Sequence, residues 1–424
     1  MSRALELGYE GTARLARALA AVAPRSSHKL LATFASRRGV VSRFQAFTRD
    51  PSRPLLWMHA PSVGEGLQAR PVLERARVSG ARMQLAYTYF SPSARAFAES
   101  LDVDFRDVLP FDVAADMRAV LAALSPTALV FSKLDVWPTL AREASRRGTR
   151  LGLVSATLAV TSSRRSGMAA RLLRDAYAHL DRVGAISTDD ADRLIALGVP
   201  ARRVTITGDT RYDQVWERVQ RLDRTQPLLA RLMGDRPTLV AGSTWPADER
   251  ALLSAWSRVA SQHPSARLII APHEPTPSHL EPIEAWARGA GLRTARLDAA
   301  DATEADVVIV DRVGVLGDLY ALATMAFVGG GFHAAGLHSV LEPAAFGVPV
   351  LFGPRHNASR DARLLIDADA AVSTPDVGAL ERVLDRWVSH RDEAGGAGEA
   401  ARAIVHAGLG AASRSYALVA ELMR

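Results

Sequence analysis

The 424-residue sequence predicts an α/β protein with two facing Rossmann-like domains, each a doubly wound parallel sheet, and a cleft between them. Short apolar runs alternate with longer segments of helical periodicity, which is the rhythm of βαβ units. This rhythm runs twice, with a gap at residues 208–236. The chain is also longer than one core usually serves, and 48% hydrophobic residues with dispersed charges are typical of a globular protein.

The first predicted element is a basic, amphipathic N-terminal segment at residues 1–53. It holds ten Lys and Arg against three Asp and Glu, so it accounts for the whole net charge of +7. Its most apolar stretch, 15–24, contains Arg17 and is far shorter than the roughly 20 residues of a membrane span. Its apolar residues recur at helical spacing: Leu15, Leu19, Val22, Leu30, Leu31 and Phe34. We expect helices that lie on an anionic membrane surface, on a partner or on the protein itself.

The remaining chain is balanced in charge, so the composition does not favour a nucleic-acid-binding surface. The first Rossmann-like domain is predicted at 54–210, a linker at 211–236 and the second domain at 237–390. A C-terminal helical segment follows at 391–424, with the Gly-rich stretch 395–398 as a loop before a final helix. The predicted strands are 55–60, 84–87, 128–131, 151–155, 183–186 and 204–207 in the first domain, and 238–241, 268–271, 307–310, 325–328 and 349–352 in the second.

Ligands of open parallel sheets bind at the carboxyl ends of the strands, so the residues that follow the predicted strands are the site candidates. After the first strand the chain reads A-P-S-V-G-E-G. Glu65 stands at a helix start, where the ionised form of a general base is favoured. It could instead only satisfy the first helical turn. Ser62 and Gly64 of the same turn are predicted to contact the acceptor or to be structural.

Two further clusters follow strands of the first domain. In S-K-L-D-V-W-P, Lys133 could bind an anionic group or pair with Asp135, and Asp135 could be a structural cap. Both are predicted as acceptor or structural residues. In G-D-T-R-Y-D, Arg211 could reach a phosphate or a sugar carboxylate, or it could pair locally with Asp209 or Asp213.

In the second domain, A-G-S-T-W-P is predicted as a small-residue turn that opens a helix. Its backbone N–H groups and the hydroxyls of Ser243 and Thr244 could hold phosphate oxygens, although an ordinary N-cap reads the same way. His273 and Glu274 follow the next strand and could contact a nucleotide or form a solvated pair. A zinc site with His279 fails on spacing, and the chain has no cysteine, so no metal is expected.

The most informative stretch is 327–354. Its glycines, Gly329, Gly330 and Gly331, end a strand and let backbone approach a ligand closely. His338 and Ser339 are predicted to open the next helix, where a phosphate is favoured. Glu342 could accept the hydroxyls of a ribose, or it could close a capping box with Ser339. The pattern differs from G-x-G-x-x-G, which argues against a dinucleotide.

Six motifs in this order resemble the bacterial 3-deoxy-D-manno-octulosonic acid (Kdo) transferase family from about Trp57 to Arg363. They are HAPSVGEG, SKLDVWP, GDTRYD, AGSTWPADE, APHEP and GGGFHAAGLHSVLEPAAFGVPVLFGP. Each is weak alone, but six in sequence are specific.

The resemblance implies a GT-B fold, CMP-Kdo as donor substrate, the lipid A precursor as acceptor and no cofactor. It also implies that Glu65 is the general base and that His338 and Glu342 match the His and Glu of the family's HN-x-x-EP motif. The reaction would be a metal-independent, inverting transfer at the cytoplasmic face of the bacterial inner membrane, by a peripheral or monotopic protein.

The chain departs from the family pattern at Ser339, where the family has Asn, at Lys133 and Asp135, where it has two Glu, and at Pro272–Glu274, where it has P-R-H. These changes make it a variant branch. The alternatives are another GT-B nucleotide-sugar transferase or an epimerase, or a non-catalytic module that holds an anionic lipid.

Overall fold

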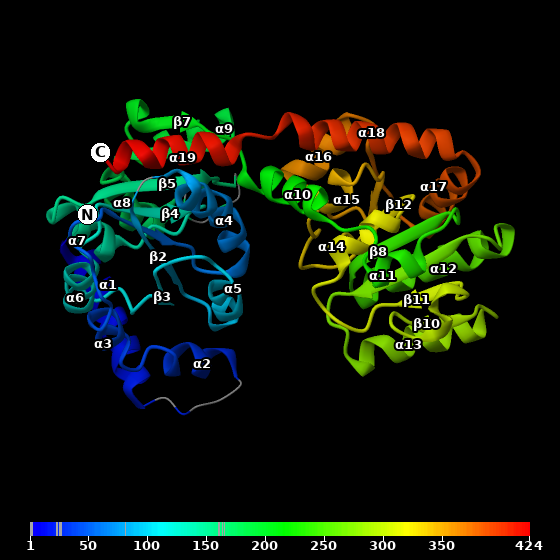
Figure 1. Ribbon diagram of the computed structural model, residues 1–424, viewed down its shortest axis with the longest axis horizontal. Helices are drawn as coiled ribbons and strands as arrows, with labels where there is room; N and C mark the ends of the chain where they lie inside the picture. The colour runs from blue at the N-terminus through cyan, green and yellow to red at the C-terminus, as the bar shows by residue number, and fades with distance from the viewer. Residues whose placement is uncertain are drawn as a thin grey trace. The chain divides into compact units, whose positions relative to one another are not determined.

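The computed structural model describes residues 3–22, 24, 28–80, 82–159, 162, 164 and 166–424, and the rest of the predicted basic segment lies outside them. The chain forms two compact units (Figure 1). Unit 1 comprises residues 1–214 and 408–424, and unit 2 comprises residues 215–407. The chain therefore passes from one unit to the other twice, within α10 (Thr210–Arg221) and after α18 (Arg391–Ala407).

Unit 1 is built on a seven-stranded, fully parallel sheet in the order β3-β2-β1-β4-β5-β6-β7, the order of a doubly wound fold. Large fully buried side chains such as Trp57, Tyr87 and Phe131 fill its core. The strands are β1 (Leu55–His59), β2 (Gln84–Tyr89), β3 (Phe105–Val108), β4 (Ala128–Ser132), β5 (Arg150–Ala156), β6 (Arg182–Ala185) and β7 (Val204–Ile206). The helices are α1 (Arg3–Val22), α2 (Lys29–Ala35), α3 (Val40–Gln45), α4 (Val63–Val78), η1 (Pro92–Ala94), α5 (Arg95–Glu99), α6 (Ala114–Leu124), α7 (Pro138–Arg146), α8 (Gly167–Ala178), α9 (Thr188–Leu197), η3 (Ala201–Arg203) and α19 (Ala411–Leu422).

The described part of the N-terminal segment packs on unit 1. Phe44 of α3 is fully buried and lies edge-on to Trp57 of β1 and Phe105 of β3. The Tyr9 hydroxyl of α1 donates to the buried Asp112 carboxylate at 2.9 Å. The outer face of α1 stays apolar and exposed, with Leu15 63% exposed. Among the described residues, no helix is long and apolar enough to cross a membrane.

Unit 2 repeats the plan with a parallel sheet in the order β10-β11-β9-β8-β12-β13-β14. Its strands are β8 (Thr238–Thr244), β9 (Arg267–Pro272), β10 (Thr294–Arg296), β11 (Val307–Ile309), β12 (Met325–Val328), β13 (Val350–Phe352) and β14 (Ala371–Ser373). Its helices, besides α18, are α11 (Pro227–Leu232), α12 (Pro246–Gln262), α13 (Pro277–Gly289), η4 (Ala300–Thr303), α14 (Leu316–Leu319), η5 (Tyr320–Leu322), α15 (Leu341–Ala345), α16 (Arg360–Asp367) and α17 (Val377–Ser389). Two parallel seven-stranded sheets confirm the predicted fold class.

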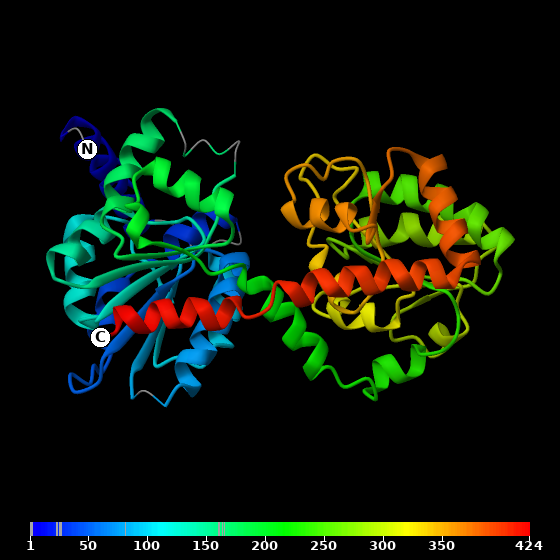
Figure 2. The ribbon, with the colours of Figure 1, turned by 90° about the horizontal axis from the view of Figure 1, so that it is seen from above.

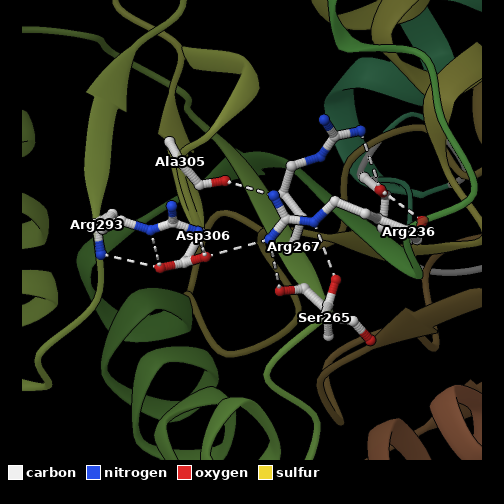
Figure 3. A network of polar contacts seen from close by, with 8 residues as sticks. Arg236, Ser265, Arg267, Arg293, Ala305 and Asp306 are labelled. Atoms are coloured by element: carbon white, nitrogen blue, oxygen red, sulfur yellow. Dashed lines mark hydrogen bonds and ion pairs between the residues drawn. The ribbon is translucent and has the colours of Figure 1, made fainter. Parts of the chain in front are cut away.

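A polar network joins the amino ends of β8, β10 and β11 in unit 2 (Figure 3). Asp306, just before β11, accepts from Arg236 at 3.2 Å and from Arg293 at 2.9 Å, while Arg236 also reaches the carbonyl of Ala305. The charge of Arg293 and its hydrogen bonds outweigh burial and lower the pKa of Asp306. This network holds the end of the sheet that lies opposite the candidate site, so the two sheet ends have different roles.

The C-terminal segment divides between the units (Figure 2). Helix α18 packs on α15 and α17 of unit 2, and α19 packs on α4, β5 and β6 of unit 1. Leu418, Val419 and Leu422 of α19 belong to the core of unit 1. The predicted loop at 395–398 is wrong, because α18 runs through it. A side chain at Gly398 would lie 2.1 Å from the carbonyl oxygen of Gly347, so this glycine permits close helix packing.

Candidate functional site

Most of the predicted site residues fall into two groups, one at the centre of each sheet, whereas Arg211 follows the edge strand β7. In unit 1 the chain leaves β1 for α4 and β4 for α7, and β1 and β4 are the neighbours at which the strand order reverses. In unit 2 the corresponding neighbours are β8 and β12. Ligands of doubly wound sheets bind at this switch point. The topology thus brings Glu65 and Lys133 together in unit 1, and Ser243 and the glycines of 329–331 together in unit 2.

Glu65 is fixed from two sides. It lies in the first turn of α4, where the hydroxyl of Ser62 donates to its Oε2. The Lys133 ammonium, at the end of β4, lies 3.1 Å from its Oε1. The hydroxyl of Ser132 donates to the Glu65 carbonyl at 3.0 Å and ties α4 to β4. A hydroxyl and a cation therefore hold the carboxylate at the switch point. Its contacts are not limited to the first turn of its own helix.

The pKa of Glu65 results from opposed effects. Burial raises it, while the Ser62 hydrogen bond and the Lys133 charge lower it, and the balance leaves the pKa below its ordinary value. The carboxylate is thus ionised at neutral pH, as a general base requires. Lys133 adopts a left-handed backbone conformation with φ of 70°, so the chain leaves the extended conformation of β4 at this residue.

The two other predicted residues of unit 1 have local partners. Asp135 forms an ion pair with Arg164, so Lys133 pairs with Glu65 and not with Asp135. Arg211 donates through Nε and Nη2 to one carboxylate oxygen of the buried Asp209, at 2.9 and 2.7 Å. Gly64, inside α4, has only the Ser62 hydroxyl near its Cβ position.

The sequence analysis missed a buried hydrogen-bond network at the end of β1. The indole N–H of Trp137 donates to His59 Nε2 at 2.9 Å. An indole can only donate, so the His59 proton sits on Nδ1 and faces the Thr88 hydroxyl oxygen at 2.9 Å. Trp57 donates to the same oxygen at 2.8 Å. Burial is the main reason that the pKa of His59 falls to about 3. This neutral histidine fixes the end of β1 from which the Glu65 turn departs.

The glycines of unit 2 make room for backbone. A Cβ at Gly329 would lie 2.1 Å from the carbonyl oxygen of Ser243, and one at Gly330 would lie 2.1 Å from that of Gly336. At Gly331 it would lie 2.3 Å from the Gly353 nitrogen. The sequence analysis explained these glycines by the close approach of a ligand. The structure gives a further reason: three chain segments cross here in direct backbone contact, which leaves no room for a side chain.

Asp248 organises this crossing and was missed by the sequence analysis. Its buried carboxylate accepts from the backbone N–H groups of Gly330 at 2.7 Å and Phe332 at 2.9 Å. It also accepts from the N–H of Trp245 at 3.0 Å, at the start of α12. One side chain therefore joins the Gly-rich turn to the first turn of α12. An Asp three residues after a helix N-cap is the available signal, since that position often carries a capping carboxylate.

The indole of Trp245 contacts three histidines. His273 and His333 each stack on it, with ring centroids 4.5 Å away. Its N–H donates to His338 Nε2 at 3.0 Å, and His338 lies 4.6 Å from His273 between ring centroids. The sequence analysis singled out His273 and His338 but not Trp245 or His333. Only the fold brings these four rings together, since they come from three different loops.

The Trp245 bond determines what His338 can offer. Because Nε2 accepts, the neutral ring carries its proton on Nδ1 and presents a donor there. Burial is the first cause, and the neighbouring His273 and His333 further causes, of a pKa below the ordinary value. His338 is therefore a neutral hydrogen-bond donor at neutral pH.

Glu342 lies in the first turn of α15, but His338 and Ser339 precede that helix, whose N-cap is Val340. The prediction that His338 and Ser339 open the helix is wrong by two residues, and the Ser339–Glu342 capping box does not form. Glu342 Oε1 instead lies 3.9 Å from Arg218 Nη1. Burial is the main reason that the pKa of Glu342 is raised, Asp318 adds to it, and the charge of Arg218 opposes it only in part.

The other predicted residues of unit 2 differ in their exposure and in whether their side chains already have partners within the fold. Ser243 adopts a left-handed conformation at φ 54°, and His273 and Glu274 are exposed. Thr244 is buried and donates its hydroxyl to Glu249 at 2.9 Å, so this hydroxyl is engaged within the fold. Glu274 contributes its backbone carbonyl to His279. Unit 1 thus presents an oriented carboxylate, and unit 2 presents aromatic rings, imidazole donors and a helix start suited to a phosphorylated ligand.

Comparisons with known proteins identify relatives of the chain and structures with the same fold. The sequence model of a family described as 3-Deoxy-D-manno-octulosonic-acid transferase (kdotransferase) matches residues 32–214. A 3-deoxy-D-manno-octulosonic acid transferase from Bordetella pertussis is 30% identical over 336 residues, 76% of each chain. The one from Haemophilus influenzae is 24% identical over 369 residues, 85% of each chain. The structure of UDP-GlcNAc 2-epimerase from Neisseria meningitidis covers 87% of this chain and 99% of its own, with a TM-score of 0.64 at 12% identity, which shows a shared GT-B-like fold.

Proposed function

From the premise that the chain belongs to the 3-deoxy-D-manno-octulosonic acid transferase family and is a glycosyltransferase, we propose that it transfers Kdo from CMP-Kdo to the lipid A precursor. One observation carries the proposal for the chemistry. The Glu65 carboxylate is ionised, held by Ser62 and Lys133, and stands at the switch point of its sheet. A base that must accept a proton from a sugar hydroxyl needs this fixed orientation.

The proposed reaction is a single displacement with inversion. Glu65 takes the proton of an acceptor hydroxyl, and the hydroxyl oxygen bonds to the anomeric carbon of Kdo. The bond from that carbon to the CMP phosphate oxygen breaks, and the phosphate leaves with the electron pair. The start of α12 and the Nδ1–H of His338 are the groups of unit 2 that favour this developing charge. No metal or cofactor has a part in the proposed step.

The proposed donor contacts divide by their geometry. The turns beside Trp245 hold most of the proposed donor contacts: Ser243, His273, Glu274, Ser339 and the glycines of 329–331. Glu342 would accept hydrogen bonds from the ribose hydroxyls. A ribose there would provide donors to a carboxylate whose pKa burial has raised. Thr244 and Arg211 have partners within the fold, so their roles as donor contacts stay predictions.

The proposed acceptor is a lipid, so we also propose that unit 1 contacts an anionic membrane surface through α1. Its exposed residues Leu7, Leu15, Leu19 and Val22 follow one helical stripe, and Arg14 beside them is 67% exposed. The double variant Leu15→Ser, Leu19→Ser should bind anionic vesicles more weakly in co-sedimentation, while CMP still stabilises it thermally. Undiminished vesicle binding would remove α1 from this role.

The test of the proposed function is turnover of CMP-Kdo, generated in situ, with the lipid A precursor. CMP release and the mass of the lipid are followed together. A lipid heavier by one or more Kdo units is the expected result. Release of CMP without a heavier lipid would reject the acceptor and retain the donor. Neither product from folded protein would reject the proposal and favour another nucleotide sugar.

A further inference from the structure

Unit 1 contains a cavity of about 460 Å³ that none of the predicted site residues lines. Its walls come from the last turn of α1, from residues 37–42 at the start of α3 and from Pro110 and Phe111 after β3. The wall is partly apolar, with Ala20, Val40 and Phe111 among its residues. The cavity therefore joins the basic N-terminal segment to the carboxyl edge of the sheet.

The lining of the cavity is positively charged. Among the residues that the structure describes, it includes three arginines, Arg17, Arg37 and Arg38, and one carboxylate, Asp116. Arg17 and Asp116 neutralise each other in an ion pair of 2.9 Å. The lining thus keeps a net charge of +2, which suits an anion with two negative charges.

Arg37 is the residue that makes this charge unusual. It is only 5% exposed, and its guanidinium donates to the carbonyl oxygens of Thr33 at 2.7 Å and Phe90 at 2.9 Å. The guanidinium also lies 4.0 Å from the Phe90 ring centroid. Within the part of the chain that the structure describes, it forms no ion pair with a carboxylate. A buried charge with uncharged partners is costly, so an anion in the adjoining cavity would gain from it.

The same contacts place the cavity near the proposed base. Phe90, which follows β2, accepts from Arg37 and donates its own N–H to the carbonyl of Pro61 at 3.0 Å. Pro61 stands four residues before Glu65, in the turn that sets its orientation. The Arg37 charge also contributes, after burial, to the low pKa of His59 at the end of β1. Cavity and base therefore share one edge of one sheet.

We propose that this cavity binds a phosphate group of the acceptor glycolipid, an inference that rests on the proposed function. Arg37 and Arg38 supply the positive charge, and the apolar wall accommodates the adjoining part of the lipid. The phosphate then positions the acceptor so that a sugar hydroxyl of the same molecule reaches Glu65. The cavity is an anchoring subsite and takes no part in bond formation.

The sharpest test uses Ser42, which lines the cavity from an exposed position on α3. Ser42→Glu adds a carboxylate to the lining, and Ser42→Gln adds the same volume without charge. Binding of a short-chain, bisphosphorylated acceptor analogue to the full chain is measured by calorimetry without donor. We expect Ser42→Glu to bind about tenfold more weakly than Ser42→Gln, because the added charge repels the phosphate. Equal affinities of the two variants would overturn the proposal.

Two further arms identify the source of the phosphate. The analogue without phosphates should bind Ser42→Glu and Ser42→Gln equally, and inorganic phosphate should compete with the bisphosphorylated analogue on the unmodified chain. Vesicles of anionic phospholipid should bind both variants equally. A difference between the variants with vesicles alone would assign the cavity to a membrane headgroup and overturn the acceptor assignment. Turnover of CMP-Kdo is measured separately, so failure of the subsite and failure of the proposed function give different results.

Discussion

Each unit contains a tryptophan whose indole N–H donates to the Nε2 of a histidine. In unit 1 the pair is Trp137 and His59, at 2.9 Å, and in unit 2 it is Trp245 and His338, at 3.0 Å. Both bonds fix the same tautomer, with the proton on Nδ1. His59, however, is fully buried and points that proton at Thr88, whereas His338 is half-buried beside two other histidines.

The comparison indicates that burial, and not the Trp–His hydrogen bond, decides whether the histidine supports the fold or can bind a ligand. In unit 1 the bonding capacity of His59 is used inside the fold, and the reactive group is a neighbour, Glu65. In unit 2 the corresponding donor of His338 is left for a ligand. Unit 1 should therefore lose chemistry or stability when altered, and unit 2 should lose donor affinity.

The largest expected effect is at the base. Glu65→Gln keeps the shape but cannot accept a proton, so kcat should fall by roughly two or more decades. Donor affinity, measured by calorimetry with CMP, should not change, because Glu65 is not a proposed donor contact and those contacts, except Arg211, belong to unit 2. Near-normal turnover would remove Glu65 from the base role and break the division between the units.

Substitution of the unit 1 tryptophan should reduce stability. Trp137→Phe leaves the buried Nε2 of His59 without a donor, which should cost about 1–3 kcal/mol in the free energy of unfolding. Denaturant titration followed by far-UV circular dichroism measures it. The matched variant Trp245→Phe should lose less, since water can reach His338. Equal losses in both variants would contradict the role that we assign to burial.

Trp245→Phe should act on the donor instead. Without the indole N–H, the His338 proton is free to move to Nε2, and the ligand loses an oriented donor. We expect kcat/KM for CMP-Kdo to fall about three- to tenfold, the value of one ordinary hydrogen bond, because the Nδ1–H of His338 is proposed to face the charge that develops on the phosphate. The ¹⁵N shifts of the His338 ring should show mixed tautomers. An unchanged tautomer with an altered kcat/KM would assign the effect to packing.

The smallest effect concerns pH. Lys133 lowers the pKa of Glu65, so Lys133→Met should raise that pKa, and Glu65 will then become protonated at a higher pH. The acid limb of kcat/KM should move to higher pH, so activity is lost earlier on acidification and little changed at pH 8. A pH–rate profile of both proteins measures the shift. An acid limb that does not move, or that moves to lower pH, would mean that Lys133 does not lower the pKa of Glu65.

The sequence predicted the central strands well, because buried parallel strands appear as continuous apolar runs. It missed β3, β10 and β14, which are all edge strands. Strand β3 shows why: its residues Phe105 to Asp107 are partly or fully exposed, so it has no unbroken apolar run. The edge strands β10 and β14 are also only three residues long.

The site was predicted less completely than the fold. Glu65 follows a recognisable strand and turn, so its position could be inferred locally. Trp245, Asp248 and His333 act through contacts between segments that are about 80 to 90 residues apart in sequence, such as the bond from Gly330 to Asp248. Such contacts leave no local periodicity, and apart from the capping position of Asp248 a single sequence offers no signal for them.

The return of α19 to unit 1 has a consequence for the order of events during synthesis. Its residues Leu418, Val419 and Leu422 complete the core of unit 1, yet they leave the ribosome after all of unit 2, residues 215–407. At translation rates of about 5–20 residues per second, the emerged unit 1 waits roughly 10–40 s for them. During that interval the surface of β5 and β6 that α19 covers is open to chaperones. The unit that begins first is thus the one that finishes last.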